Sequence, residues 1–325
     1  MMKKAKIWLL AAAGMVLTGA ALNVSAEKSA IRVGALKGPT SMGLVSLMER
    51  SKEGDTGNSY EFEMVTAADE LLAQVVSEKV DIALIPANTA SVLYNKTEGN
   101  IRVLDINTLG VLYMLESGGT IQSVSDLEGK TVYLTGKGTT PDYVLQYLLR
   151  ENGLSADAVR LEYKSEATEV VSALAADEAA IGLLPQPFVT VALGQNEKLR
   201  IALDLTEEWD KLQTEGGSSL VTGVTITRAD FLEKNEEAVR QFLTEHEASS
   251  DFTNENLEEA AELIAELGIV QQPAIAQKAI PYCNITCVQG EEMKEALEGY
   301  LEVLYGLDSA TVGGALPSED FYYIP

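Results

Sequence analysis

The sequence predicts an α/β protein made of two lobes. Its 325 residues suggest two domains, since about 150 residues per domain is a reasonable starting expectation. Apolar strands alternate with amphipathic helices over residues 30–115 and again over residues 129–205, a pattern typical of parallel sheets covered by helices. Apolar residues make up 46% of the chain and charged residues 22%, which argues against disorder and against a multi-pass membrane protein.

Each element is identified by its periodicity and by the turn residues around it. The first series comprises strand 30–36, helix 41–49, strand 60–65, helix 69–79, strand 80–85 (ended by Pro86), helix 88–94 and the long apolar stretch 101–115. The second series comprises strand 129–134, helix 140–150, strand 159–163, helix 167–176, strand 179–184, helix 188–193 and strand 199–205. A strand at 220–227 and helices at 232–247, 257–267 and 291–305 complete the chain.

The two series are expected to form two lobes joined by two crossings. We place the crossings near residues 110–116 and near residues 217–223. Lobe one then comprises residues 27–112 and 222–325, and lobe two residues 113–221, with the helical C-terminal third packed on lobe one. Ligands of open α/β sheets bind beyond the carboxyl ends of the strands, so we expect a site in the cleft where the lobes face one another.

The N-terminus has the features of a secretory signal peptide. Three lysines precede an apolar run of about 16 residues, and Val24-Ser25-Ala26 offers the small residues of a cleavage site. The run is shorter than the roughly 20 residues that span a membrane, although a retained anchor is the alternative. We expect residues 1–26 to be removed and the protein to act outside the cytoplasm. The segment Leu17-Thr18-Gly19-Ala20 resembles a lipoprotein box with alanine in place of the lipidated cysteine.

The charge of the chain excludes some partners. Its net charge of −25 becomes −28 without the first 26 residues, which carry three lysines and no acid, and so acidic a body repels nucleic acid. The only histidine, His246, lies between two glutamates, which suggests an exposed position and disfavours a histidine metal site or general base. The motifs G-x-S-x-G and H-E-x-x-H are absent, and Gly136-x-Gly138 lacks the third glycine of a nucleotide-binding loop.

The loops that follow the strands carry the candidate ligand-binding residues. Gly38 permits close approach of the backbone, and Thr40 and Ser41 are good helix N-caps. Lobe two repeats this arrangement, with Thr140 as N-cap and Pro141 at the first helical position. Free N–H groups at both helix starts, with Lys37 and Lys137 nearby, favour an anionic or acceptor-rich ligand. An ordinary capped helix start is the alternative reading of each loop.

Other candidates have a structural alternative as well. Asn88 could cap a helix or offer its amide to a ligand, and Tyr113 could stack on one. Gln186 and Phe188 could project into the cleft, or form a rigid turn with Phe188 in the core. Trp209 is expected to anchor a surface helix rather than to line the cleft. The complete candidate set is Lys37, Gly38, Pro39, Thr40, Ser41, Asn88, Thr89, Tyr113, Gly138, Thr139, Thr140, Gln186 and Phe188, with no catalytic and no metal-binding residues.

The two cysteines leave two possibilities open. In an oxidising compartment, Cys283 and Cys287 could form a disulfide if they lie in a turn. In a strand, residues four apart lie about 13 Å from each other and cannot be bridged. Two cysteines with no histidine or cysteine partner do not make a zinc site.

Several of these motifs, taken in order, resemble the extracellular substrate-binding proteins of ABC importers. The segments that carry the resemblance are Ile31–Thr40, Asp81-Ile82-Ala83-Leu84-Ile85-Pro86-Ala87-Asn88, Asp126-Leu127-Glu128-Gly129-Lys130-Thr131 and Gly136–Pro141. The resemblance is greatest to the nitrate, sulfonate and taurine binding proteins and to the thiamine-precursor branch. It implies a type II periplasmic-binding-protein fold, with two α/β lobes joined by a two-crossing hinge.

The resemblance also implies a function without catalysis or cofactor. A small organic or anionic molecule, sulfonate-like, nitrate-like or a vitamin precursor, would be captured by hinge-bending between the lobes and delivered to a membrane permease driven by its ATPase. We expect a monomer. The alternative is an enzyme on the same fold that acts on a pyrimidine or a menaquinone-pathway intermediate, and a sensor without a transport role is a third possibility.

Overall fold

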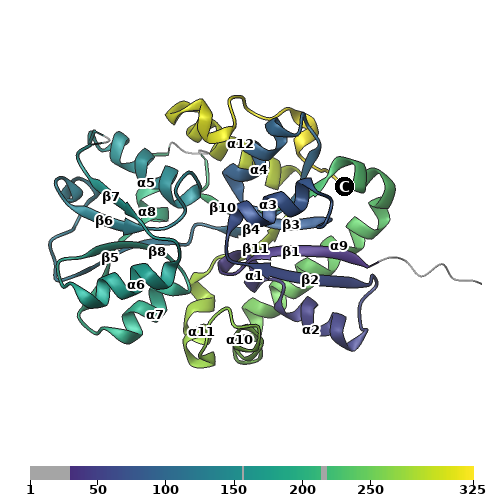
Figure 1. The fold of residues 1–325 in the computed structure, drawn as a ribbon, viewed down its shortest axis with the longest axis horizontal. Helices are drawn as coiled ribbons and strands as arrows, with labels where there is room; N and C mark the ends of the chain where they lie inside the picture. Colours follow the sequence, from purple (N-terminus) through teal and green to yellow (C-terminus); the bar gives the residue numbers. More distant parts are fainter. Residues whose placement is uncertain (1–29, 156, 214–217) are drawn as a thin grey trace, which may run out of the picture.

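Two β-sheets lie side by side in the structure, each flanked by helices (Figure 1). The structure is a computed structural model, and it describes residues 30–155, 157–213 and 218–325. The predicted signal peptide and lipoprotein-like box lie outside the described residues. Within the described ranges, no helix is both long enough and apolar enough to cross a membrane.

The first sheet has six strands and forms the centre of lobe one. They are β1 (Ile31–Leu36), β2 (Tyr60–Val65), β3 (Ile82–Pro86), β4 (Ile101–Leu109), β10 (Val221–Arg228) and β11 (Ile285–Val288). Their order is β11-β4-β10-β3-β1-β2. Strands β1, β2 and β3 are parallel, whereas β10 is antiparallel to β3 and β4, and β11 is antiparallel to β4.

The second sheet has five strands and forms the centre of lobe two. They are β5 (Leu112–Ser117), β6 (Thr131–Leu134), β7 (Arg160–Tyr163), β8 (Ile181–Pro185) and β9 (Leu199–Asp204), in the order β7-β6-β8-β5-β9. Strand β5 is antiparallel to β8 and β9, and the other pairs are parallel. The prediction of parallel sheets is therefore wrong for β5 and β10, which enter each lobe from the other, and for β11. An antiparallel neighbour needs no helical crossover from the strand it pairs with.

Helices flank both sheets (Figure 1). Lobe one carries α1 (Pro39–Met42), α2 (Val45–Glu53), α3 (Ala68–Val76), α4 (Ala87–Lys96), α9 (Ala229–Glu255), α10 (Leu257–Glu266), α11 (Pro273–Ala279) and α12 (Gly290–Leu307). Lobe two carries α5 (Thr140–Glu151), α6 (Ala167–Ala176), α7 (Phe188–Gln195) and α8 (Leu205–Asp210). Helix α11 and strand β11 were not predicted, α8 was expected only as a surface helix anchored by Trp209, and α1 and α2 lie where one helix was predicted.

The chain passes between the sheets twice. Gly110 and Val111 join β4 to β5, and the return runs from α8 to β10. Gly110 has a steric reason to be glycine, since a Cβ there would clash with the hydroxyl of Thr206. The short first crossing places the carboxyl end of β4 directly beside the first residues of lobe two.

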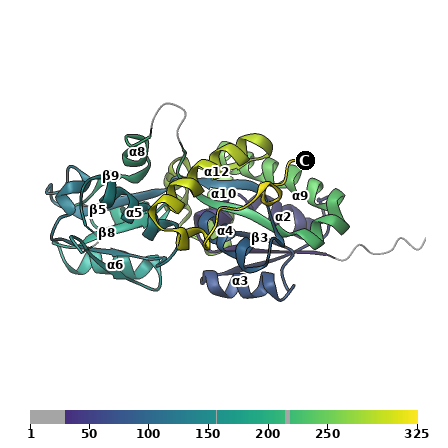
Figure 2. The same cartoon turned by 90° about the horizontal axis from the view of Figure 1, so that it is seen from above.

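Apolar packing continues across the lobe boundary. Helix α12 lies on lobe one yet contacts α5 of lobe two (Figure 2). Helix α11 of lobe one likewise contacts α7 of lobe two. The ring of Trp209 in α8 is fully buried between Tyr147 of α5 and Tyr300 of α12, with centroid separations of 4.7 and 5.6 Å. Trp209 therefore anchors helix α8, as expected, and α12, which lies about 90 residues further along the chain, covers its ring.

Candidate ligand-binding site between the lobes

The loops after β3 and β6 meet at the lobe boundary. Asn88, in the first turn of α4, donates its amide N–H to the Gly138 carbonyl at 3.4 Å. The hydroxyl of Thr140, the first residue of α5, lies 3.5 Å from Asn88 Oδ1 and 3.5 Å from the Thr222 carbonyl of β10. Elements of both lobes thus bring polar groups to one place, at the carboxyl ends of their strands.

Four buried residues meet at this junction, here called the interlobe cluster: Asn88, Thr140, Thr222 through its carbonyl, and Tyr300, whose hydroxyl lies beside Thr140. Thr222 Oγ1 and the Tyr300 hydroxyl have no hydrogen-bond partner among the described residues. Burial raises the pKa of Tyr300, so its hydroxyl stays protonated and remains a donor. Buried polar groups usually find partners, so the cluster offers hydrogen-bonding capacity that a bound solute could use.

Asn88 is neither a helix cap nor a free amide. Pro86 is the N-cap of α4, and Asn88 lies inside the helix. Its Nδ2 also donates to the Thr311 carbonyl at 3.2 Å, and Thr89 donates to Asn88 Oδ1 at 3.4 Å. Asn88 therefore links α4, the C-terminal segment and lobe two, a role that neither sequence-based alternative included.

The loop before α5 is held by a carboxylate that the sequence analysis did not single out. Thr139, not Thr140, is the N-cap, so Thr140 and Pro141 both lie inside the helix, and the predicted cap is wrong by one residue. Buried Asp142 accepts hydrogen bonds from the Gly138 N–H at 2.8 Å and from the Tyr163 hydroxyl at 2.7 Å. The Gly138 N–H, which was expected to attract an anionic ligand, is therefore already hydrogen-bonded to the Asp142 carboxylate.

The loop after β1 also differs from the expected capped helix. Gly38 is the N-cap of the short helix α1, so the prediction of Thr40 or Ser41 as cap is wrong. The Ser41 hydroxyl donates to the Gly38 carbonyl at 3.0 Å, and Thr40 donates to the Leu36 carbonyl at 3.3 Å. Pro39 is the first residue of α1. These hydroxyls stabilise the turn itself, and both side chains are buried.

Thr40 nevertheless lies close to the strand that returns from lobe two. A Cβ on Gly223 of β10 would lie 2.6 Å from Thr40 Cγ2 and 2.6 Å from Asn107 Oδ1. Asn107 is buried in β4, accepts a hydrogen bond from Thr108 Oγ1 at 2.9 Å and donates to Thr225 Oγ1 at 3.2 Å. The first loop thus packs against β10 one residue beyond Thr222.

The two lysines expected near the ligand lie on the surface. Lys37 and Lys137 are both exposed. The ammonium of Lys137 lies 5.4 Å from the ring centroid of Tyr163, a cation–π distance within lobe two. The ammonium groups of the two lysines, which favoured an anionic ligand, are therefore solvated. The buried side chains of the interlobe cluster are uncharged.

The remaining candidates belong to the packing of lobe two. Tyr113 of β5 is buried in an apolar cluster against which half-buried Phe188 packs. Burial, followed by the nearby Asp204 carboxylate, raises the pKa of Tyr113 to about 12. Gln186 Oε1 accepts hydrogen bonds from the N–H and the hydroxyl of Thr190 at 3.2 and 2.9 Å. These contacts match the rigid-turn reading of residues 185–188, with Phe188 packed against the core.

Of the sequence candidates, the structure brings Asn88, Gly138 and Thr140 into contact across the lobes. Thr222 and Tyr300 were missed because each belongs to a segment far away along the chain. Periodicity assigns Thr222 to a strand and Tyr300 to a helix, but it does not show that the Thr222 carbonyl and the Tyr300 hydroxyl both lie beside Thr140. The sequence offered one signal for Thr222, namely its position directly before Gly223 in the predicted second crossing.

His246 and the two cysteines differ from their expected positions. His246 is fully buried, not exposed, because the face of α9 that carries it packs on the first sheet. Both cysteines are free thiols, so the disulfide alternative is wrong: Cys283 follows a helical turn, while Cys287 lies in β11. Cys287 has a histidine neighbour after all, since its Sγ lies 3.7 Å from His246 Nδ1.

Comparisons with known proteins agree with the two-lobed architecture. An "ABC transporter" structure from Parabacteroides distasonis is 26% identical, with a TM-score of 0.74 over 92% of this chain and 99% of that one. The periplasmic aliphatic sulphonate binding protein SsuA from Escherichia coli is 16% identical, with a TM-score of 0.70 over 90% and 96%. A Candida albicans protein described as having the generic periplasmic binding protein fold is 15% identical, with a TM-score of 0.61 over 90% and 93%.

These similarities show a periplasmic binding protein fold with two α/β lobes. No functionally curated protein matches the sequence significantly. A family profile described as "NMT1/THI5 like" matches residues 73–260, which is more than half of the chain. The chain therefore belongs to the NMT1/THI5-like family.

Proposed function

We propose that this protein is the solute-binding component of an ABC importer. It captures a small molecule between its lobes outside the cytoplasm, without altering it, and delivers it to a membrane permease. The observation that carries the proposal is the interlobe cluster, where the buried hydroxyls of Thr222 and Tyr300 lack partners among the residues that the structure describes. The likeness to an ABC transporter structure and to a sulphonate binding protein supports the same role.

The side chains of the cluster indicate the kind of solute. Asn88, Thr140, Thr222 and Tyr300 are uncharged and supply hydroxyl and amide groups, so they recognise a ligand through hydrogen bonds rather than through ion pairs. A small organic molecule rich in acceptors fits this chemistry, for example an aliphatic sulfonate or a pyrimidine vitamin precursor. Micromolar affinity, about −8 kcal/mol, needs only a few such bonds in a dry cleft.

Capture requires the lobes to separate and close again. Closure is favoured only by the difference in ligand affinity between the open and closed forms. In the described conformation, Asn88 and Thr140 connect the lobes through hydrogen bonds of 3.4–3.5 Å, near the outer limit for such bonds. Weak contacts of this kind exchange readily for bonds to a solute, which is the behaviour that a capture site needs.

The test is a thermal-shift screen of the chain from residue 27 onwards against sulfonates, nitrate, pyrimidines and vitamins. A ligand at 100 times its Kd adds about 2.7 kcal/mol to the free energy of unfolding. The Thr222→Val and Tyr300→Phe variants remove the unpartnered hydroxyls. We expect each to weaken binding about threefold to tenfold while leaving the unliganded protein equally or more stable, because an unpaired buried hydroxyl is lost.

Ser117→Ala is the matched control. Within the described part of the chain, Ser117 Oγ is also buried without a partner, but it lies at the far end of β5, so its removal should leave the affinity unchanged. Equal ligand affinity in the wild type, Thr222→Val and Tyr300→Phe proteins would place the ligand elsewhere. Turnover of a bound compound would overturn capture as the function. So would binding of the protein to a membrane partner when no small molecule in the screen shifts its melting temperature.

A further inference from the structure

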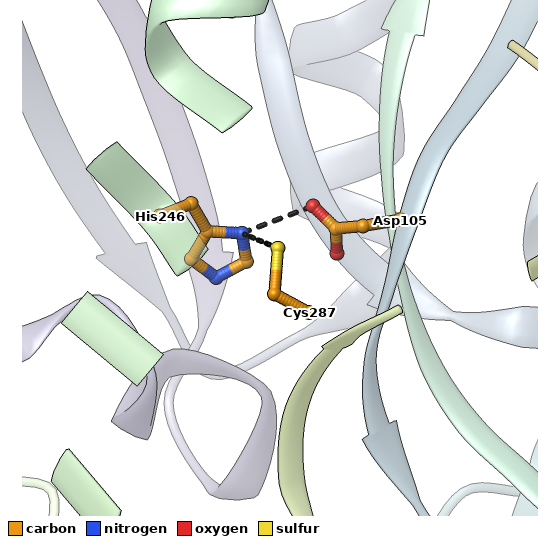
Figure 3. Close-up of side chains that lie close together, drawn as sticks. All are labelled: Asp105, His246 and Cys287. Atoms are coloured by element: carbon orange, nitrogen blue, oxygen red, sulfur yellow. Dashed lines mark hydrogen bonds and ion pairs between the residues drawn. The ribbon is translucent and has the colours of Figure 1, made fainter. Parts of the chain in front are cut away.

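Asp105, His246 and Cys287 converge at one point inside lobe one (Figure 3). They come from β4, α9 and β11, which are far apart in the sequence. His246 Nδ1 lies 3.0 Å from Asp105 Oδ2 and 3.7 Å from Cys287 Sγ, and the three donor atoms all lie within 4.8 Å of one another. Asp105 and His246 are fully buried, and Cys287 is half-buried.

The arrangement does not suit a nucleophilic cysteine. In a Cys–His–Asp relay, the thiol and the carboxylate bind opposite nitrogens of the imidazole. Here both approach the same nitrogen, Nδ1, so the carboxylate cannot orient the ring for proton removal from the thiol. Burial, followed by the Asp105 carboxylate, also raises the pKa of Cys287, which disfavours a free thiolate.

The same convergence suits a metal ion. Zinc binds imidazole nitrogen and carboxylate oxygen at about 2.0–2.2 Å and thiolate sulfur at about 2.3 Å in a tetrahedron, so its ligand atoms lie roughly 3.3–3.7 Å apart. The N–O and N–S separations in the structure, 3.0 and 3.7 Å, are close to these values. Little movement of the side chains would be needed to place an ion between them.

The surroundings of the three residues complete the site. Thr225 donates its hydroxyl to the second carboxylate oxygen of Asp105 at 2.7 Å, and Gln289 donates to Cys287 Sγ at 3.5 Å. Such bonds orient ligands from outside the first coordination sphere. Cys287 lies on the edge strand of the sheet and is partly exposed, which gives an ion a path of entry.

The second ring nitrogen of His246, Nε2, can carry the imidazole proton. His246 Nε2 and Ser250 Oγ are both buried without a hydrogen-bond partner among the described residues. Gly43 leaves space beside them, since a Cβ there would lie 2.8 Å from Ser250 Oγ and 3.6 Å from Nε2. When a metal occupies Nδ1, a neutral imidazole carries its proton on Nε2.

We propose that Asp105, His246 and Cys287 bind a divalent, sulfur-accepting metal ion, with zinc as the best fit. Binding forms bonds from the metal to Oδ, Nδ1 and Sγ. The thiol proton leaves to solvent, and the imidazole proton moves from Nδ1 to Nε2. The two negative charges of carboxylate and thiolate balance the ion, so a buried carboxylate gains a counter-charge. The fourth position of the tetrahedron remains for water or a small anion.

The experiment uses metal-stripped protein without a histidine tag, titrated with Co²⁺ and then with Zn²⁺. We expect one Co²⁺ per chain, with thiolate-to-cobalt charge-transfer absorption and tetrahedral d–d bands, both removed by Zn²⁺. Cys287→Ser should abolish the charge-transfer band, and Asp105→Asn should weaken binding at least tenfold. Cys283→Ser is the matched control, because Cys283 is buried with its Sγ directed to the Ala279 carbonyl, and it should leave the spectrum unchanged.

Two measurements on the wild-type chain do not depend on whether a variant folds. His246 is the only histidine, so one set of imidazole ¹⁵N signals reports its tautomer, and Zn²⁺ should move the proton to Nε2. Zn²⁺ should also slow alkylation of Cys287. If folded wild-type protein binds neither metal, or if Cys287→Ser keeps the thiolate band that Cys283→Ser loses, the site does not exist as proposed.

Discussion

Asp142 holds the loop that brings Gly138 and Thr140 to the interlobe cluster, and Asp142→Ala tests that role. The carboxylate lies in the first turn of α5 and accepts hydrogen bonds from the Gly138 N–H, from the Tyr163 hydroxyl and from Gln146 Nε2, at 2.8, 2.7 and 2.5 Å. Alanine removes all three bonds together with a negative charge at the helix N-terminus. We expect a loss of both stability and ligand affinity.

The size of the stability loss in Asp142→Ala depends on which hydrogen-bond donors are left without a partner. Gly138 is exposed, so its N–H can bond to water, whereas the half-buried Tyr163 hydroxyl loses a charged acceptor. Hydrogen bonds to charged groups contribute about 1.5–3 kcal/mol when buried, and the lower part of that range applies here. The charge at the helix terminus contributes about 0.3–1 kcal/mol. Together these predict a decrease of about 2–3 kcal/mol in the free energy of unfolding.

Urea unfolding followed by circular dichroism measures this decrease. Asp126→Ala is the matched control: Asp126 also accepts two backbone N–H groups at 2.8 Å, but in an exposed turn far from the cluster. Its removal should cost less and leave ligand affinity unchanged. In the Asp142→Ala background, Tyr163→Phe should cost less than in the wild type. The reasoning is refuted if Asp142→Ala destabilises no more than Asp126→Ala.

Three further predictions follow from buried contacts. Trp209→Ala should lower the free energy of unfolding by about 3–5 kcal/mol, because the ring is fully enclosed. Denaturant titration measures this loss, and a value below about 1 kcal/mol would contradict the prediction. Burial by itself raises the pKa of Asp81, but hydrogen bonds from Arg32 outweigh it and lower the pKa. Asp81 therefore contributes stability above about pH 4 that is lost as the pH falls through its lowered folded pKa, so the melting-temperature difference between wild type and Asp81→Asn should shrink in acid. Gly223→Ala should weaken ligand binding, because its Cβ would lie 2.6 Å from two neighbouring side chains, whereas Gly119→Ala, with open space around it, should bind as the wild type does.

Local patterns predicted most of the elements because each rests on neighbouring residues. The strand at 60–65 and the helix at 167–176 have the predicted bounds, since alternation and helical spacing are unambiguous there. Helix α11 and strand β11 were missed because their runs of seven and four residues are too short to show a period. The break between α1 and α2 depends on packing around Gly43, which no periodicity reveals.

The candidate site could be predicted only in part. Asn88, Gly138 and Thr140 follow predicted strands, and the general rule that ligands bind at strand ends singled them out. The lysines of the same loops were given too much weight, because a loop sequence does not show whether a long side chain turns towards a cleft or towards solvent. The role of Asp142 depends on Tyr163, which β7 places beside it from 21 residues away.

The sequence by itself determined that this protein consists of two α/β lobes, because hydrophobic period and turn residues act over a few positions. Only the tertiary structure decided which polar groups meet: Thr222 and Tyr300 at the lobe junction, and Asp105, His246 and Cys287 inside lobe one. Between two glutamates, His246 looks exposed along the chain, yet it is fully buried. A helix has one covered and one solvated face, and which face a residue occupies is fixed by the partner that packs on it, not by its neighbours in the sequence.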